Sequence, residues 1–156
     1  MAIEIERKFL VNSDIYKQFA YDQQYIKQAY LSSHPERSVR IRIKNDCAYI
    51  TVKGKSSENG LSRYEWEKEI PVSEAEELLL MCEPGGINKI RYKVKHEDVI
   101  VEIDEFFGEN EGLVMAEVEL STEIQEFTKP EWLGAEVTGD KKYYNSMLSK
   151  NPYINW

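Results

Sequence analysis

Ile3–Val11 reads IEIERKFLV, and polar and apolar side chains alternate over most of this stretch. Successive side chains of an extended chain point to opposite faces, so the stretch predicts a β-strand with one charged and one apolar face. Glu4, Glu6 and Lys8 then share the charged face. An ordinary half-exposed strand with solvated charges shows the same pattern, so the rest of the sequence has to decide whether these residues do more.

Seven later segments are also strand-like, and the same separation of apolar from polar residues recurs along the chain. In most of them the polar residues are long, ionised and doubled at a spacing of two, and Asn45–Asp46 is a turn signal that predicts a hairpin. The segments are Tyr25–Ser32, Ser38–Lys44, Ala48–Lys53, Leu61–Ile70, Lys89–Lys95, Val99–Phe106 and Val114–Leu120.

Helix signals are fewer. Asn12–Asp14 offers capping side chains for a short helix, and Ser73–Glu76 is a capping box for a helix that ends at Pro84–Gly86 and covers the apolar side of the sheet. Pro130–Leu133 fits a helix start, and Asp140 is placed to cap a last helix. We therefore expect mixed α and β structure.

Composition narrows the classes of protein. With 156 residues, 42% of them hydrophobic, we expect one domain over residues 1–156. No apolar run approaches the roughly 18 to 20 residues of a membrane helix, and no signal-peptide core is present, so we expect a cytoplasmic protein without a membrane partner. The net charge of −8 argues against a nucleic-acid partner. The sequence is compatible with a homodimer as well as with a monomer.

The charged doublets allow two sheet arrangements. A flat sheet with its polar face in water satisfies the pattern. Alternatively, the sheet closes, helices cover its apolar outside, and the charged face lines a barrel or tunnel. Confining so many charges is costly unless they pair with each other, with ions or with a charged ligand. The tunnel lining would comprise Glu4, Glu6, Lys8, Arg40, Arg42, Lys53, Glu65, Glu67, Glu69, Lys89, Arg91, Lys93, Glu102, Asp104, Glu117 and Glu119.

Handling of phosphates by metal uses both signs of charge at once. Divalent cations such as Mg²⁺ take carboxylate oxygens, for which the rows Glu4/Glu6 and Glu117/Glu119 are suited. Arginine and lysine side chains neutralise phosphoryl oxygens. The sequence has no Walker-type glycine loop, no H-E-x-x-H motif and no C-x-x-C pair, so the other common sites are not indicated.

The ordered set of doublets resembles a known family. Residues 4–8 match the E-x-E-x-K signature of the CYTH superfamily, the triphosphate tunnel metalloenzymes, and the later doublets fall in that family's order. They are Arg40-x-Arg42, Lys53, Glu65-x-Glu67, Lys89-x-Arg91, Glu102-x-Asp104 and Glu117-x-Glu119. The resemblance spans nearly the whole chain and implies an α+β fold, a closed eight-stranded antiparallel β-barrel with a charged lining and helices packed on the outside.

The resemblance also implies roles for individual residues. Glu6 is expected to orient or deprotonate the attacking water and Lys8 to be catalytic with it, while Glu65, Glu67 and Glu69 balance the basic strands by ion pairing. The expected ligands of Mg²⁺ or Mn²⁺ are Glu4, Glu6, Glu117 and Glu119, with Asp104 as a further ligand or as a residue that supports the ligands. The expected phosphate clamp is Lys8, Arg40, Arg42, Lys53, Lys89 and Arg91.

The expected activity is metal-dependent hydrolysis of a small-molecule triphosphate, foremost inorganic tripolyphosphate to pyrophosphate and phosphate, with nucleoside triphosphates as further substrates. A class IV adenylyl cyclase and a thiamine triphosphatase are alternatives within the same family. A non-catalytic module that binds polyphosphate or nucleotides, and a structural module with a solvated sheet, are alternatives outside enzymology.

Overall fold

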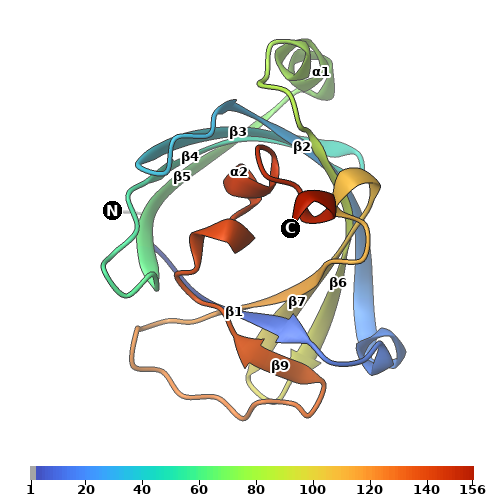
Figure 1. Ribbon diagram of the computed structural model, residues 1–156, viewed down its shortest axis with the longest axis vertical. Coiled ribbons are helices and arrows are strands. Elements are labelled where there is room, and N and C mark those ends of the chain that lie inside the picture. Colours follow the sequence, from blue (N-terminus) through green and yellow to red (C-terminus); the bar gives the residue numbers. More distant parts are fainter. Residues whose placement is uncertain (1–2) are drawn as a thin grey trace.

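A computed structural model describes residues 3–156, and within that range the chain forms nine strands. All paired strands are antiparallel, and they curve into a ring (Figure 1). The strands are β1 (Ile3–Val11), β2 (Ala20–Ser32), β3 (Arg37–Lys44), β4 (Cys47–Gly54), β5 (Ser62–Ile70), β6 (Ile87–His96), β7 (Val99–Phe106), β8 (Val114–Glu119) and β9 (Leu133–Glu136).

Strand β1 closes the barrel. Its first residues pair with β5, with Ile3 opposite Tyr64, and its middle pairs with β8, with Glu6 opposite Glu119. The sheet order is β5-β4-β3-β2-β6-β7-β8-β1, so these two pairings join its ends. The predicted closed eight-stranded antiparallel barrel is confirmed, and β9 adds a short strand beside the end of β1, where Val11 lies opposite Leu133.

The outer face of the barrel carries much of the hydrophobic core. Phe9, Ile103 and Val118 point outward and pack under Tyr16 and Trp132. These outward residues alternate with the charged ones of the same strands, so one face of each strand is dry and the other is charged. The tunnel interpretation required this division.

Helix α1 (Val72–Leu80) lies outside the barrel, as predicted, and buries Ala75 against Ile41 and Ala48. The predicted capping box is wrong, because Ser73 already lies inside the helix. Pro71 is the N-cap residue, its backbone is extended, and no side chain caps the helix. The Pro71 carbonyl instead accepts the first backbone hydrogen bonds of the helix.

Two other helix predictions are corrected. The segment after Asp14 forms only a 3₁₀ turn, η1 (Ile15–Gln18), because β2 begins at Ala20, opposite Val94 of β6. The segment from Pro130 forms strand β9 rather than a helix, because it extends the sheet beside β1 and buries Trp132 in the outer core. Pairing with a distant strand decided both cases.

The C-terminal segment lies within the ring of strands, not on its outside (Figure 1). It comprises the 3₁₀ helix η3 (Lys141–Tyr143), the short helix α2 (Asn145–Leu148) and the 3₁₀ helix η4 (Tyr153–Asn155); a further 3₁₀ turn, η2 (Gly108–Asn110), follows β7. We call residues 140–150 the C-terminal plug. Asp140 caps η3 by accepting from the Lys142 backbone N–H, as its sequence position predicted.

The plug fits because the inward rows of four strands become apolar toward one end. At that end the inward rows of β1, β6, β7 and β8 carry Leu10, Ile87, Phe106 and Met115, which pack with Tyr143 and Leu148 of the plug. A predicted outside helix therefore fills one end of the barrel, because apolar side chains are available there to bury it. In residues 3–156, no helix combines the length and the apolar character needed to cross a membrane.

Candidate active site

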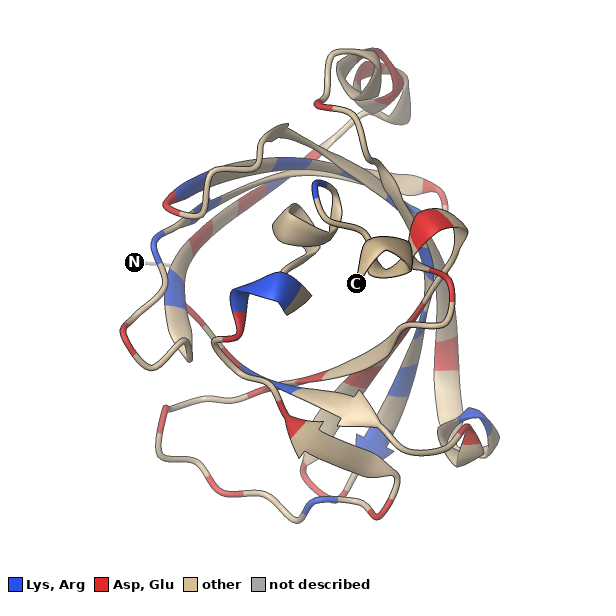
Figure 2. Cartoon of the chain, viewed as in Figure 1, with Lys and Arg blue, Asp and Glu red and all other residues tan. Residues whose placement is uncertain are grey.

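The barrel encloses a cavity of about 310 Å³ whose lining is dominated by charged side chains. Figure 2 shows Lys, Arg, Asp and Glu distributed around the barrel strands. The cations in the lining are Lys8, Arg40, Arg42, Lys44, Lys53, Arg63, Lys89, Arg91 and Lys93. The acidic residues are Glu4, Glu6, Glu65, Glu67, Glu102, Glu117 and Glu119.

Of the residues predicted to line the tunnel, two do not reach the cavity surface. Glu69 is exposed toward the end of β5, beyond the part of the strand that borders the cavity. Asp104 is 2% exposed and lies behind Lys89 and Arg91, which both donate to it. The other predicted lining residues all border one cavity, which β1 helps to close.

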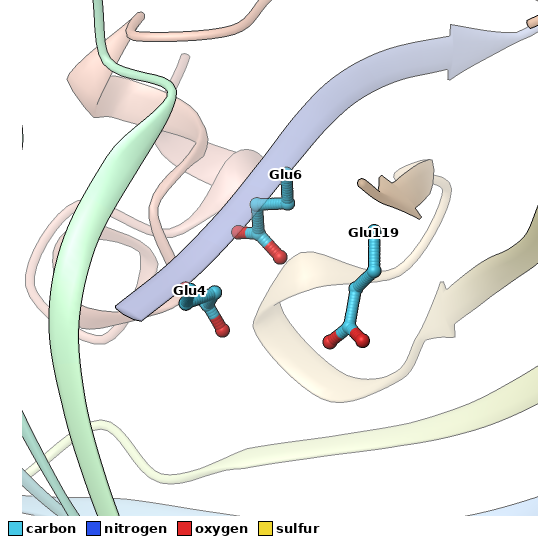
Figure 3. A group of neighbouring side chains, drawn as sticks. All are labelled: Glu4, Glu6 and Glu119. Atoms are coloured by element: carbon cyan, nitrogen blue, oxygen red, sulfur yellow. The ribbon is translucent and has the colours of Figure 1, made fainter. Parts of the chain in front are cut away.

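Three carboxylates, which we call the acidic wall, converge from β1 and β8. Glu4 and Glu6 share the inner face of β1, and Glu119 lies directly opposite Glu6 on β8. One oxygen from each of the three lies within 4.8 Å of the others. Figure 3 shows their carboxyl groups turned toward one common space. Hard oxygen ligands at this separation fit a divalent cation such as Mg²⁺ or Mn²⁺.

The carboxylates of the acidic wall are partly buried and repel one another. Burial and the neighbouring Glu117 and Glu4 raise the pKa of Glu6 well above its usual range. Burial and nearby carboxylates also raise the pKa of Glu119. Burial opposes ionisation of Glu4 too, but the Lys53 ammonium, 3.0 Å from its carboxylate, holds its pKa below the usual value. The wall therefore has more negative charge than its neighbours neutralise.

Glu117 occupies a different environment from the acidic wall. It lies opposite Lys8 in the β1–β8 register. Although burial works against its ionisation, Lys8 and Arg91 hold its pKa well below the usual range. Glu117 therefore lies between the other predicted metal ligands and the cations of the cavity.

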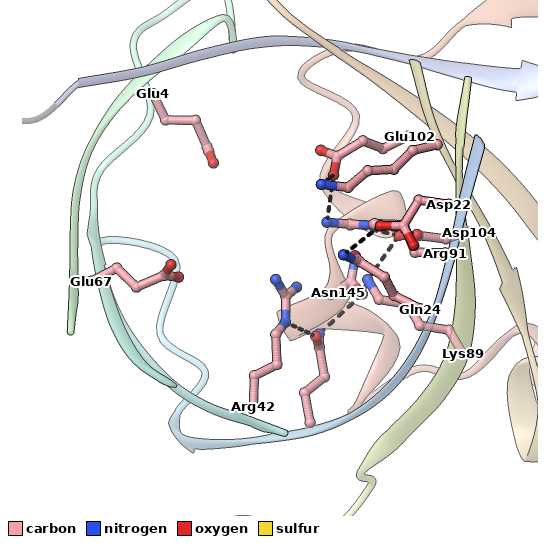
Figure 4. A network of polar contacts seen from close by, with 12 residues as sticks. Glu4, Asp22, Gln24, Arg42, Glu67, Lys89, Arg91, Glu102, Asp104 and Asn145 are labelled. Carbon is pink, nitrogen blue, oxygen red and sulfur yellow. Dashed lines mark hydrogen bonds and ion pairs between the residues drawn. The ribbon is translucent and has the colours of Figure 1, made fainter. Parts of the chain in front are cut away.

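Across the cavity, Arg42, Lys89 and Arg91 form what we call the basic wall (Figure 4). Lys89 Nζ donates to Asp104 Oδ2 at 2.8 Å. Arg91 grips the same carboxylate with two hydrogen bonds, from Nε to Oδ1 at 2.8 Å and from Nη2 to Oδ2 at 2.9 Å. Burial opposes ionisation of Asp104, but Arg91 and Lys89 keep its pKa below the usual value. Asp104 therefore orients two cations.

The basic wall retains uncompensated positive charge. Burial, together with Arg40 and Arg91, lowers the pKa of Arg42 to about 9. Burial also lowers the pKa of Lys89 to about 7, with Arg91 and Arg42 acting in the same direction against Asp104. Burial is the main cause of both low pKa values, and an anion bound between these side chains would remove the repulsion that adds to it.

Two further predicted clamp residues are paired with glutamates of β5. Arg40 Nη2 donates to Thr51 Oγ1 at 3.1 Å and lies 3.5 Å from Glu67. Lys53 Nζ lies 3.3 Å from Glu65, in addition to its contact with Glu4. The ion-pair interpretation of Glu65 and Glu67 therefore fits the geometry.

Sequence reasoning missed several residues that border or support the cavity, and four of them matter for the site. Arg63 lines it from β5, and Tyr144 of the plug places its ring 4.8 Å from Lys8 Nζ. Gln28 and Asn145 are uncharged and belong to no doublet, so no charge pattern marked them. For Arg63 the signal was present, because it alternates in phase with Glu65.

The cavity presents carboxylates suited to a metal ion opposite cations suited to phosphoryl oxygens. That combination defines a class of site for a metal-bound polyanion. A family model described as CYTH domain matches residues 2–152, so the chain belongs to the CYTH domain family.

Two relatives and one solved structure cover almost the whole chain. An inorganic triphosphatase of Acetivibrio thermocellus is 52% identical over 157 residues, covering 100% of this chain and 99% of the relative. One of Nitrosomonas europaea is 37% identical, covering 94% and 96%. A crystal structure of an inorganic triphosphatase superimposes with a TM-score of 0.66 at 33% identity, covering 96% of this chain and 95% of the other.

Proposed function

We propose that this protein is a metal-dependent triphosphatase that hydrolyses inorganic tripolyphosphate to pyrophosphate and phosphate. One observation carries the proposal: a cavity of about 310 Å³ holds a wall of repelling carboxylates opposite a wall of repelling cations. Asp104 balances only part of the positive charge of the basic wall, and Lys53 only part of the negative charge of the acidic wall. A triphosphate with a divalent cation would supply both missing charges. The naming of two relatives as inorganic triphosphatases supports the substrate.

The acidic wall is the proposed metal site for Mg²⁺ or Mn²⁺, with Glu4, Glu6 and Glu119 as ligands. A bound divalent ion would supply charge neutralisation and a water of lowered pKa. Glu117 lies beside this set, two residues before Glu119 on β8. Both oxygens of Asp104 are occupied by Lys89 and Arg91, so we assign it the orientation of those cations instead of a metal bond.

The phosphate clamp remains the predicted set of Lys8, Arg40, Arg42, Lys53, Lys89 and Arg91. Glu6 is the carboxylate assigned to orient the attacking water and accept its proton. Lys8 lies two residues further along the same face of β1, where its ammonium neutralises the phosphoryl group under attack. The leaving pyrophosphate stays neutralised by the cations of the basic wall.

The lining favours an inorganic substrate over a nucleotide. Among the described residues of the cavity surface, apolar area comes from Tyr30, Ile100 and Tyr144, while nearly all the others are charged or polar. A nucleobase gains affinity by stacking on aromatic faces, and this cavity offers few. We therefore place ATP and thiamine triphosphate behind tripolyphosphate as substrates.

A phosphate-release panel tests this function. Tripolyphosphate, ATP, thiamine triphosphate and pyrophosphate are each incubated with Mg²⁺, with Mn²⁺ and with a chelator. We expect the fastest release from tripolyphosphate with either metal, and none with the chelator. Glu126→Gln, a change at an exposed glutamate that does not border the cavity, serves as the matched control for Glu6→Gln.

Other outcomes would point elsewhere. Cyclic nucleotide and pyrophosphate formed from ATP would indicate a cyclase. Tight binding without turnover under any metal would indicate a binding module, and pyrophosphate cleaved as fast as tripolyphosphate would count against a site built for three phosphates. A cytoplasmic location belongs to the same proposal and is tested by cell fractionation, while size-exclusion chromatography distinguishes monomer from homodimer.

A further inference from the structure

Asn145 brings the C-terminal plug into contact with the basic wall. Its side-chain oxygen Oδ1 accepts one hydrogen bond from Lys89 Nζ at 2.9 Å and another from Gln28 Nε2 at 3.2 Å (Figure 4). Because the donors are an ammonium and an amide NH₂, Oδ1 is the acceptor in both contacts, which fixes the orientation of the Asn145 amide.

Gln28 extends the contact to a second cation. It lies on β2 and is 0% exposed, and its Oε1 accepts from Arg42 Nε at 2.9 Å. The Gln28 amide thus accepts a hydrogen bond from Arg42 and donates one to Asn145. A continuous chain of hydrogen bonds runs from Arg42 through Gln28 and Asn145 to Lys89, and on through Asp104 to Arg91.

The chain of hydrogen bonds matters because of how an ammonium is oriented. Lys89 has three N–H donors on a flexible stem. Asp104 takes one and Asn145 takes another, so the direction of the third is set by these two contacts. Without Asn145, the ammonium would keep only its hydrogen bond to Asp104, and its direction would no longer be set by two contacts.

The plug itself is held firmly enough to act as a support. Tyr143 and Leu148 are buried in the apolar end of the barrel, on either side of Asn145 in the sequence. At Gly85, a Cβ atom would lie 1.9 Å from the carbonyl oxygen of Ser149, so the barrel and the plug approach each other at backbone distance. A side chain carried on such an element is precisely placed.

We propose that Asn145 is a positioning residue for the phosphate clamp, which holds Lys89 directly, and Arg42 through Gln28, in the orientation that receives phosphoryl oxygens. The proposal rests on the proposed function, because the binding of phosphate by Lys89 and Arg42 is itself part of that function. Asn145 acts through these side chains, and the C-terminal plug thereby takes part in substrate binding.

Two single variants test this from opposite sides of the contact. Asn145→Leu removes the acceptor from the plug, and Gln28→Leu breaks the same chain of hydrogen bonds from β2 while leaving the plug unchanged. Each is expected to raise KM for tripolyphosphate about tenfold and to change kcat less than about threefold, because a misplaced cation weakens binding of substrate and transition state alike. Asn151→Leu, at an exposed position just beyond the plug, should leave both constants unchanged.

The double variant Asn145→Leu with Gln28→Leu separates positioning from general damage. If both residues serve one chain of hydrogen bonds, the double variant should raise KM about as much as either single variant. Effects that multiply to about a hundredfold would indicate two independent lesions and would overturn the proposal. Thermal melting of each variant shows whether it is folded, and if Asn145→Leu unfolds, Gln28→Leu alone decides the question.

Lys89→Met distinguishes failure of this proposal from failure of the proposed function. A Lys89→Met protein with unchanged KM would show that Lys89 does not bind substrate, and the clamp assignment would fall. If Lys89→Met raises KM while Asn145→Leu and Gln28→Leu do not, the positioning role is wrong and the proposed function stands.

Discussion

The acidic wall and the basic wall face each other across one cavity, but the protein treats them differently. On the basic side, Asp104 is 2% exposed and receives hydrogen bonds from both Lys89 and Arg91. On the acidic side, Glu6 and Glu119 are raised in pKa by burial and by other carboxylates. One wall contains its own counter-ion, whereas the other is left with repelling charges of the same sign.

This difference indicates that the side chains of the basic wall already have a fixed geometry in the free protein. A carboxylate that holds two cations fixes their geometry in the free protein, at the cost of some of their attraction for an anion. Carboxylates that repel each other take up a fixed geometry only when a cation binds between them. We therefore expect the acidic wall to govern whether the reaction proceeds and the basic wall to govern how well substrate binds.

The largest expected effect comes from the acidic wall. Glu6→Gln keeps the shape of the side chain but removes one of three converging carboxylates. We expect kcat/KM for tripolyphosphate to fall at least about 100-fold with Mg²⁺ present, because metal affinity and the proton acceptor are both lost. Phosphate release measures the loss, and a variant that retained wild-type activity would remove Glu6 from the site.

The same substitution has a second consequence for stability. Because the pKa of folded Glu6 lies well above the ordinary value of 4.5, the folded chain binds the extra proton in that interval. Stability of the metal-free wild type therefore falls as pH rises from 4.5 through the raised pKa. The stability of Glu6→Gln should therefore fall less steeply with pH than that of the wild type. Melting curves of both proteins over this pH interval measure the difference.

The next largest effect concerns the basic wall, and the quantity to measure is the number of protons taken up when tripolyphosphate binds. Burial lowers the pKa of Lys89 to about 7, so a share of the Lys89 side chains is neutral in the free protein at about pH 8. Tripolyphosphate favours the charged form, so its binding to the wild type should take up more protons than its binding to Lys89→Met. Calorimetry in two buffers of different ionisation enthalpy measures the difference, and equal uptake by both proteins would contradict the assignment.

Displacing the plug tests the support of the basic wall. In Gly85→Ala, the new Cβ would lie 1.9 Å from the Ser149 carbonyl oxygen, at a φ of +96°. Gly108→Ala is the matched control, since its φ is +64° and no atom lies within 4 Å. We expect Gly85→Ala to be less stable than the control by roughly 2 kcal/mol and to raise KM severalfold. Thermal melting and kinetics of both variants decide; equal behaviour would mean that the plug tolerates displacement.

The smallest expected effect lies outside both walls. Arg7 and Glu136 form a bidentate ion pair on the outer surface, with side chains 31% and 35% exposed. Because exposed pairs contribute little, Arg7→Gln should lower stability by about 1 kcal/mol or less and leave activity unchanged. A large loss of activity would show that the outer face of β1 affects the cavity as strongly as its inner face does.

Much of the fold was readable from local alternation. The doublets of β1, β3, β6, β7 and β8 placed their charges on one face but were compatible with a flat sheet as well as a barrel. The closed barrel, which the family resemblance implied, is confirmed. The roles of the individual metal ligands and clamp residues stay predictions. The family predicted from the E-x-E-x-K signature and the later doublets is confirmed by the CYTH domain match.

The misses share a physical cause. Local signals at Pro130 and Asn12 favoured helices. Pairing with β1 stabilised strand β9 after Pro130, and pairing of β2 with β6 from Ala20 onward left room for only the 3₁₀ turn η1 after Asn12. Asp104 alternates in phase with Glu102 and was expected at the cavity surface, yet its cross-strand neighbour Arg91 covers it. Neither outcome depends on the residues nearest in sequence, so no local pattern contains it.

The sequence alone determined that β1 carries Glu4, Glu6 and Lys8 on one face, because side-chain direction in a strand follows from residue spacing. It also determined that the later strands carry the matching cations and carboxylates. Only the tertiary structure decided that Glu119 faces Glu6, that Asp104 holds the basic wall, and that Asn145 reaches Lys89 from the plug. These contacts join residues far apart in the chain, and they exist only once the barrel has closed and its apolar end has been filled.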